Sequence, residues 1–246
     1  MKSVIVIPAR YASSRFPGKP LAMLAGKPMI RHVWERATAS CADQVQVATD
    51  DQRIFDAVTS FGGQAVMTKS THPSGTDRIA EAVSGLDGDY RVVVNVQGDE
   101  PLMPSGVIDR LIEQMKMNPA VEMATVAVPG KRGAMTPDNV KVVMGRDGRA
   151  LYFSRAEIPF VRTGGVAAPV YLHWGIYAYR RDVLEKFVKL PAGVLENSEK
   201  LEQLRALENG ISIQVLVSDL ESIGVDTPAD LERAEKKLAE FQHAMR

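Results

Sequence analysis

The sequence predicts an α/β fold, in which a mostly parallel sheet has helices on both faces and carries a small inserted lobe. Short β-branched runs alternate with amphipathic helical patterns through the first half of the 246 residues, and such alternation is typical of βαβ units. The run Val92-Val93-Val94 is apolar on both faces, as expected of a strand covered by helices on each side. The rhythm changes near Asn139, which predicts the lobe.

The first half contains the predicted parallel core. Its strands are β-branched runs at residues 3–7, 44–49, 64–68, 91–96 and 123–128. Its helices have apolar residues at three- and four-residue spacing, at residues 28–39, 52–61, 76–86 and 105–117. Because a helix follows most of these strands, we expect right-handed crossover connections.

The second half predicts a different arrangement. Residues 141–144 and 149–154 read as a hairpin turned by Asp147-Gly148. A loop rich in Gly, Ala and Pro at 163–169 leads to a strand at 175–179. A charged helix at 195–207 is ended by Asn209-Gly210. A strand at 211–217 and an amphipathic helix at 228–241, with Thr227 as its N-cap, complete the chain.

Composition restricts the possible partners and the compartment. Lys+Arg and Asp+Glu number 30 each, so no global field attracts nucleic acid or a membrane surface. Cys41 is the only cysteine, which excludes an internal disulfide and a CxxC metal site and suits a reducing cytoplasm. We expect a cytoplasmic protein, because no secretory signal pattern and no run of about 18 apolar residues is present.

The segment after the first strand is basic. Arg10, Arg15 and Lys19 occur there with no acid among them and with one glycine, Gly18. A phosphate cradle made of backbone N–H groups needs several glycines, so this loop is expected to bind an anion through side-chain charge. The alternative is a solvated surface loop.

Acidic residues follow two other predicted strands. Asp99 and Glu100 come after the central strand in "VNVQGDEP", and Asp226 lies in "GVDTP". Ligands of open parallel sheets bind beyond the carboxyl ends of the strands, and Mg²⁺ prefers one or two carboxylates plus substrate phosphates. The pattern indicates a metal–triphosphate site. Each acid could instead cap the helix that follows it.

Other polar residues have two readings. In "SGTDRIAEA", Ser74, Thr76 and Arg78 could contact a base or ribose, or could belong to a capped helix whose arginine faces solvent. His173 could be a catalyst or a structural histidine, and Tyr177 could have a site role or belong to the core. Residue chemistry alone therefore predicts a Mg²⁺-dependent enzyme that acts on a nucleotide.

With these residues in view, the chain resembles the 3-deoxy-manno-octulosonate cytidylyltransferases, also called CMP-KDO synthetases. The resemblance runs through nearly the whole sequence and rests on motifs in the expected order. These are "IPARYASSRFPGKPL", "ATDD", "SGTDRIAEA", "VNVQGDEP", "ALYFSRAEIPF", "H-x-GIYAY", "LEQLRALE.G" and "GVDTPADLE". The stretch between "IPF" and "YLHWG" is short, and residues 195–199 differ from those of common members.

The resemblance implies a fold, a reaction and partners. It implies one GT-A/Rossmann-like nucleotidyltransferase domain over 1–246, with a substrate and dimerisation lobe at about 139–210, and a homodimer. It implies Mg²⁺ and the reaction of CTP with KDO (3-deoxy-D-manno-octulosonate) to CMP-KDO and pyrophosphate, for lipopolysaccharide biosynthesis. Alternatives are a C8-modified KDO or another sugar acid as acceptor, a glycosyltransferase on the same scaffold, and a non-catalytic nucleotide-binding module.

The resemblance also implies site residues. Catalysis would involve Lys19, Asp99 and Asp226, of which the two aspartates would ligate Mg²⁺. The nucleotide would be bound by Ala9, Arg10, Arg15, Lys19, Ser74, Gly75, Thr76, Arg78 and Gln97. The sugar would be bound by Gln97, Arg155, His173, Tyr177, Glu202 and Gln203, with Arg155 facing the sugar carboxylate.

Overall fold

The chain divides into two compact units in the computed structural model. The structure describes residues 1–12, 16–220 and 222–244, without the side chains of 241–244. The first unit comprises Met1–Ile112 and Ser222–Arg246, and the second comprises Glu113–Glu221. Both units contain a sheet with helices, so the predicted α/β class is confirmed.

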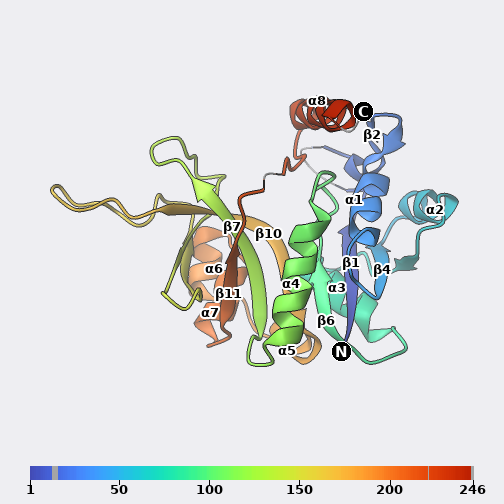
Figure 1. Ribbon diagram of the computed structural model, residues 1–246. Helices are drawn as coiled ribbons and strands as arrows, with labels where there is room; N and C mark the ends of the chain where they lie inside the picture. Colours follow the sequence, from blue (N-terminus) through green and yellow to red (C-terminus); the bar gives the residue numbers. More distant parts are fainter. Residues whose placement is uncertain (13–15, 221, 245–246) are drawn as a thin grey trace. The chain divides into compact units, whose positions relative to one another are not determined.

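The sheet of the first unit is parallel. Its strand order is β6-β1-β4-β5 (Figure 1), and all three neighbouring pairs run parallel. Its strands are β1 (Lys2–Ala9), β4 (Gln44–Thr49), β5 (Ala65–Met67) and β6 (Tyr90–Asn95). The residues of β1 from Val4 to Ile7 are fully buried, which means that both faces of this central strand are covered.

Helices connect the strands of the first unit. They are α1 (Met29–Thr38), α2 (Gln52–Ser60), α3 (Gly75–Ser84) and the beginning of α4 (Ser105–Met117). A short antiparallel pair, β2 (Met23–Leu24) with β3 (Lys27–Pro28), precedes α1 and was not predicted. Asp51 caps α2 by accepting from the backbone N–H of Arg53 at 3.0 Å, and Ser74 caps α3.

The last helix of the chain returns to the first unit. It is α8 (Pro228–Ala244), and its predicted N-cap is confirmed, since Thr227 Oγ1 accepts from the N–H of Asp230 at 3.3 Å. Ala234 and Leu238 of α8 pack into a buried cluster with Leu24 and Leu102. Removal of this apolar surface from water stabilises the packing of α8 against the segment that follows β6.

The sheet of the second unit is mixed. Its strand order is β11-β7-β10-β8-β9, with β11 parallel to β7 and the other pairs antiparallel. Its strands are β7 (Met123–Gly130), β8 (Lys141–Met144), β9 (Ala150–Ser154), β10 (Val170–Arg180) and β11 (Ile213–Val217). The predicted hairpin is confirmed, since β8 and β9 pair antiparallel. Gly148 in its turn has a φ of 77°, a positive value that favours glycine.

The predicted helix at 195–207 is wrong, because the chain forms two short helices there. They are α6 (Val194–Glu199) and α7 (Gln203–Glu208), separated by Lys200 at φ 54°. The Glu199 carboxylate accepts from Ser154 Oγ at 2.6 Å and from Arg155 N at 2.9 Å. These tertiary bonds fix the end of α6. A further helix, α5 (Arg181–Phe187), was not predicted.

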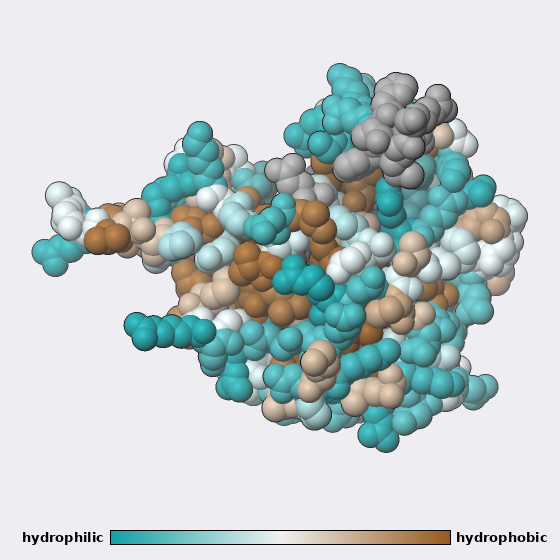
Figure 2. Space-filling view, in the orientation of Figure 1, coloured by the Kyte–Doolittle hydropathy of each residue, from teal (hydrophilic) through white to brown (hydrophobic). Residues whose placement is uncertain are grey.

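The segment between β9 and β10 projects from the second unit (Figure 1). It contains the predicted Gly-, Ala- and Pro-rich loop, and its apolar residues Phe160 and Val166 are 86% and 96% exposed. Figure 2 shows apolar and polar residues mixed along this projection.

Among the described residues, no helix is both long enough and apolar enough to cross a membrane.

Candidate active site

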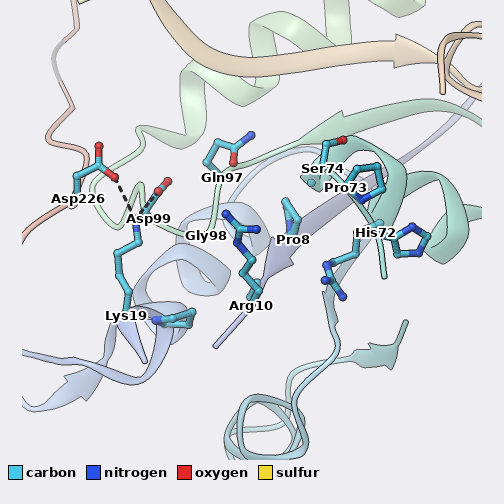
Figure 3. A pocket seen from close by; sticks show the side chains of 14 residues that line it. Pro8, Arg10, Lys19, His72, Pro73, Ser74, Gln97, Gly98, Asp99 and Asp226 are labelled. Carbon is cyan, nitrogen blue, oxygen red and sulfur yellow. Dashed lines mark hydrogen bonds and ion pairs between the residues drawn. The ribbon is translucent and has the colours of Figure 1, made fainter. Parts of the chain in front are cut away.

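A cavity of about 250 Å³ opens in the first unit. It lies beyond the carboxyl ends of β1 and β6 and beside the N-terminus of α3 (Figure 3), where open parallel sheets bind ligands. Nine residues with predicted nucleotide or metal roles line it: Ala9, Arg10, Lys19, Ser74, Gly75, Arg78, Gln97, Asp99 and Asp226. Thr76 is buried and is not among the lining residues.

Lys19 lies between the two predicted metal ligands. Its Nζ is 2.7 Å from Asp99 Oδ2 and 3.2 Å from Asp226 Oδ1, as the dashed lines in Figure 3 show. The lysine side chain is 13% exposed, whereas those of Asp99 and Asp226 are 34% and 49% exposed. The three charged groups therefore form one cluster that solvent reaches from the carboxylate side.

Hydrogen bonds between two loops bring the aspartates together from distant parts of the chain. The N–H of Val225 donates to Asp99 O at 2.9 Å, and Ser222 Oγ donates to Glu100 Oε2 at 2.7 Å. The segment that carries Asp226 is thus pinned along the loop that carries Asp99. Both acids line the cavity, and the N-cap of α8 is Thr227 and not Asp226.

The start of α8 also orients Asp226. The Asp230 carboxylate accepts from the backbone N–H groups of Asp226 at 3.1 Å and Thr227 at 2.9 Å. Partial burial acts to raise the pKa of Asp230, but the hydrogen bonds from Thr227 and Asp226 outweigh it, and the pKa lies below its usual value. Thr227 and Asp230 form a reciprocal cap that holds the preceding residue in place.

The basic loop that carries Lys19 has a defined turn. Gly18 has φ 71° and donates its N–H to Tyr11 O at 2.9 Å, and the Arg53 guanidinium stacks 3.4 Å from the centroid of the Tyr11 ring. The positive φ favours glycine at this position. Of the three predicted cations, Arg10 and Lys19 line the cavity, while Arg15 lies outside the described residues.

Gly98 has a packing reason for its small size. A Cβ on this residue would lie 2.8 Å from the carbonyl oxygen of Pro8, closer than real Cβ atoms approach backbone. The loop after β6 can therefore lie directly against the end of β1, and this close approach places Gln97 and Asp99 at the cavity. Gln97 donates to Asn95 Oδ1 at 3.2 Å.

The two aspartates fit the requirements of Mg²⁺. They converge on one cationic centre, the Lys19 ammonium, and both remain open to solvent. No cluster of three or more His, Cys, Asp or Glu side chains suited to a metal occurs in the described part of the chain. A magnesium ion here would consequently depend on substrate phosphates to complete its ligands, which is its usual mode of binding.

The opposite wall of the cavity is the first turn of α3. Ser74 Oγ accepts from the N–H of Asp77 at 3.2 Å and donates to its carboxylate at 2.7 Å. Arg78 is 4% exposed, so its side chain does not face solvent. Its guanidinium donates to Asp50 Oδ2 at 2.8 Å and to Thr68 Oγ1 at 2.5 Å.

His72 is a cavity residue that the sequence analysis missed. It lines the cavity next to Pro73 (Figure 3), and its Nε2 bonds the carboxylate of Glu81. The hydrogen bond from His72, together with one from Lys69 N, lowers the pKa of Glu81. Its place in the sequence was a usable signal, because His72 lies two residues before Ser74, the N-cap of α3.

Of the predicted sugar-binding residues, Gln97 belongs to the first unit and the other five belong to the second. His173 and Tyr177 lie on β10 with ring centroids 5.2 Å apart. Burial lowers the pKa of His173 to about 3. His173 Nε2 lies 3.1 Å from Thr125 Oγ1, which also lies 2.7 Å from Ile176 O and 3.2 Å from Trp174 O.

Tyr177 has an unusual environment in the second unit. Its residue is 8% exposed, and its hydroxyl has no hydrogen-bond partner among the described residues. Burial raises the pKa of Tyr177, as do the neighbouring Tyr179 and Glu202. Glu202 and the buried Gln203 stand at the start of α7. A buried hydroxyl without a partner is costly and suits a ligand that supplies one.

Arg155 is held by backbone carbonyl groups. Its Nε donates to Glu199 O at 2.8 Å, and its two terminal nitrogens donate to Pro137 O at 3.0 Å and Lys200 O at 3.4 Å. Only part of a guanidinium's five N–H donors remains for a ligand. Arg155 therefore fixes the chain around the break between α6 and α7, and its sugar-carboxylate role stays a prediction.

Comparison with known proteins agrees with this architecture. Residues 4–213 match a family model described as cytidylyltransferase. A 3-deoxy-manno-octulosonate cytidylyltransferase of Syntrophobacter fumaroxidans is 54% identical over 98% of both chains. An 8-amino-3,8-dideoxy-manno-octulosonate cytidylyltransferase of Shewanella frigidimarina is 51% identical over 97% of this chain and 99% of its own.

A solved structure agrees with the sequence relatives. A CMP:2-keto-3-deoxy-manno-octonic acid synthetase complexed with CTP has a TM-score of 0.93 and 45% identity, with 98% of this chain and 99% of that chain covered. Such identity over nearly full length shows common family membership and not the fold alone. The chain is a nucleotidyltransferase and belongs to the 3-deoxy-manno-octulosonate cytidylyltransferase family.

Proposed function

We propose that the protein transfers CMP from CTP to the anomeric hydroxyl of KDO and releases pyrophosphate, with Mg²⁺ as cofactor. The single observation that carries this proposal is the cluster in which the Lys19 ammonium lies 2.7 Å from Asp99 and 3.2 Å from Asp226. A cation and two carboxylates that line one cavity could combine phosphate binding with metal binding.

The reaction is an in-line displacement at the α-phosphorus of CTP. The anomeric oxygen of KDO forms the new P–O bond, the bond between the α-phosphorus and the bridging oxygen breaks, and pyrophosphate leaves with that oxygen. The hydroxyl proton passes to solvent. No protein nucleophile is needed, because positioning and charge neutralisation supply most of the catalysis of such a transfer.

The residues of the cavity have separate tasks in this reaction. Arg10 and Lys19 line it from the first strand and the loop that follows, and their charges would offset the negative charge that grows on the leaving pyrophosphate. Asp99 and Asp226 would hold Mg²⁺. When bound, the ion would neutralise phosphate oxygens and lower the pKa of the attacking hydroxyl.

The lysine has alternative partners in this scheme. In the described structure its ammonium bonds both carboxylates. Asp99 and Asp226 would hold either this ammonium or Mg²⁺, and Lys19 would be available to the triphosphate when it no longer pairs with the carboxylates, since both interactions compete for the same charge. Lys19 would thus hold the two acids in position before the substrate enters, and bind phosphate afterwards.

The identity of the acceptor is supported by the named relatives. One relative at 54% identity is named for KDO, and another at 51% identity is named for its 8-amino derivative. KDO is the acceptor we propose, and the 8-amino sugar is the specific second candidate. We also propose that the enzyme is a cytoplasmic homodimer whose product enters lipopolysaccharide biosynthesis.

The decisive experiment measures pyrophosphate release with Mg²⁺ for each of the four nucleoside triphosphates, with and without an acceptor. The acceptors are KDO and 8-amino-3,8-dideoxy-manno-octulosonate, tested in parallel arms. Release with CTP plus KDO alone supports the proposal. Release only with the amino sugar would transfer the function to the second candidate, and silence with both acceptors would reject cytidylyl transfer to this class of sugar acid.

A further inference from the structure

A buried ion pair lies behind the α3 wall of the cavity. Asp50 directly follows β4, and its Oδ2 accepts from an Arg78 terminal nitrogen at 2.8 Å. The side chains of the arginine and the aspartate are 5% and 17% exposed. Arg78 lines the cavity, whereas Asp50 does not. The Asp50 carboxylate can therefore affect the cavity only indirectly, through the Arg78 guanidinium with which it pairs.

The same guanidinium joins three segments of the first unit. Its other terminal nitrogen donates to Thr68 Oγ1 at 2.5 Å. Thr68 in turn donates both its hydroxyl, at 3.1 Å, and its backbone N–H, at 2.8 Å, to Thr49 O. Arg78 therefore ties the carboxyl ends of β4 and β5 to the first turns of α3 through hydrogen bonds.

The position of α3 determines the shape of the cavity. Ser74 and Gly75 form its wall, and a Cβ on Gly75 would lie 3.4 Å from Cγ of Pro8, at the end of β1. The helix start thus lies close enough to the strand end that a single added Cβ would come into van der Waals contact with Pro8. Ser74 lies across the cavity from Lys19 (Figure 3), so a shift of α3 would change the width of the cavity.

We infer that Asp50 is a positioning residue for the nucleotide, acting through Arg78 to hold the first turn of α3 as a fixed wall of the cavity. The inference rests on the proposed function in taking that cavity as the CTP site. Without the carboxylate, the guanidinium would be left buried with no counter-charge, which is strongly unfavourable. The arginine would then move toward the cavity or solvent, and the wall would move with it.

The test substitutes Asp50→Asn and compares it with Asp51→Asn. Asp51 is the adjacent residue and also forms an arginine ion pair, but its partner Arg53 is 59% exposed and neither residue lines the cavity. Asparagine remains a good N-cap, so α2 keeps its start. We expect the KM for CTP to rise about tenfold in D50N, with kcat within about twofold of wild type, and neither value to change in D51N.

A double-mutant cycle asks whether Asp50 acts through Arg78. We expect D50N in an R78M background to have less than about a twofold further effect, because the group it positions is already gone. Thr68→Val removes an acceptor without altering charge, and it should raise the KM for CTP about threefold. An unchanged KM in both D50N and T68V, an equal rise in D51N, or additive effects in the cycle would overturn the inference.

The readouts separate this inference from the proposed function. Direct calorimetric titration of CTP into wild type, D50N and D51N measures binding without any acceptor. If no acceptor gives pyrophosphate release, the proposed reaction fails, while a Kd about tenfold weaker in D50N alone still supports the role of Asp50. If the wild type turns over normally and all three proteins bind CTP equally, the inference fails and the proposed function stands. Thermal unfolding of each variant checks that the fold is retained.

Discussion

The ammonium of Lys19 lies 2.7 Å from Oδ2 of Asp99, a residue 80 positions away in the chain. A second carboxylate, that of Asp226, lies 3.2 Å from the same nitrogen. Partly exposed ion pairs contribute little to stability, so we expect this arrangement to serve ligand binding and not the stability of the fold. The three charges are complementary to a triphosphate with its metal, and each member can be tested by itself.

Asp99→Asn is expected to reduce turnover at least about a hundredfold, because the neutral amide neither neutralises Lys19 nor binds a divalent cation as a carboxylate does. The fold should be unaffected, since the side chain is 34% exposed. Steady-state pyrophosphate release measures the loss, and circular dichroism checks the fold. The matched control is Asp89→Asn, which removes an exposed surface pair with Arg91. Normal Mg²⁺-dependent activity in D99N would remove the metal assignment.

Lys19→Ala is expected to lower kcat and weaken CTP binding, because it removes a cation from the cavity and leaves two carboxylates facing each other. We expect a loss of about a hundredfold in kcat/KM, the size typical of a lost charge-stabilising group. Lys27→Ala serves as control, since Lys27 pairs with Glu35 and does not line the cavity. Kinetics in K19A equal to those of K27A would return the basic loop to the solvated-surface reading.

Gly98→Ala is expected to damage the site through the backbone. The added Cβ would meet the carbonyl oxygen of Pro8 at 2.8 Å, so the loop after β6 must move away from the end of β1 and take Asp99 with it. Misplacement of about 1 Å can cost a hundredfold in rate. Gly106→Ala is the control, because a Cβ there meets nothing within 4 Å. Equal kcat values for the two variants would contradict the close-approach argument.

Parts of the fold could be predicted because local pattern and tertiary environment agree. Residues 44–49 and 105–117 have the predicted bounds, since each is bordered by polar or turn-forming residues and buries an apolar face. The helix at 195–207 was wrong for the opposite reason. The helical sequence pattern continues without a break through these residues. However, the Glu199 carboxylate accepts hydrogen bonds from Ser154, at the end of β9, and from Arg155, the next residue. No local pattern contains that information.

The site was predictable in position but not in its pairings. Strand ends in a parallel sheet share one edge, which predicts that Lys19, Asp99 and Asp226 lie near one another, and all three line the cavity. The ion pairs between them join residues 80 and 207 positions apart, and such contacts depend on how loops pack. The pairing of Arg78 was not predictable either. Its position in the helical pattern allowed it to face solvent, but its side chain is buried and pairs with Asp50.

The pH dependence of stability should report the environment of His173. Burial lowers its folded-state pKa to about 3, whereas the unfolded chain titrates at about 6.5. The unfolded state therefore binds a proton as the pH falls below about 6.5, and the folded state does not. The stability that the protein gains from keeping His173 neutral is therefore fully present above about pH 6.5, and it is lost progressively as the pH falls toward about 3.

His173→Gln should consequently flatten the stability profile on the acid side of neutrality. Between about pH 7 and about pH 5.5 the wild type should lose about 1 kcal/mol more unfolding free energy than the variant, as linkage requires for one proton. Glutamine keeps a donor for Thr125 Oγ1, which lies 3.1 Å from His173 Nε2. Urea unfolding of both proteins measures the difference, and carboxylates with lowered pKa, such as Asp230, contribute equally to both. Parallel profiles would show that the folded protein protonates His173 as readily as the unfolded chain does.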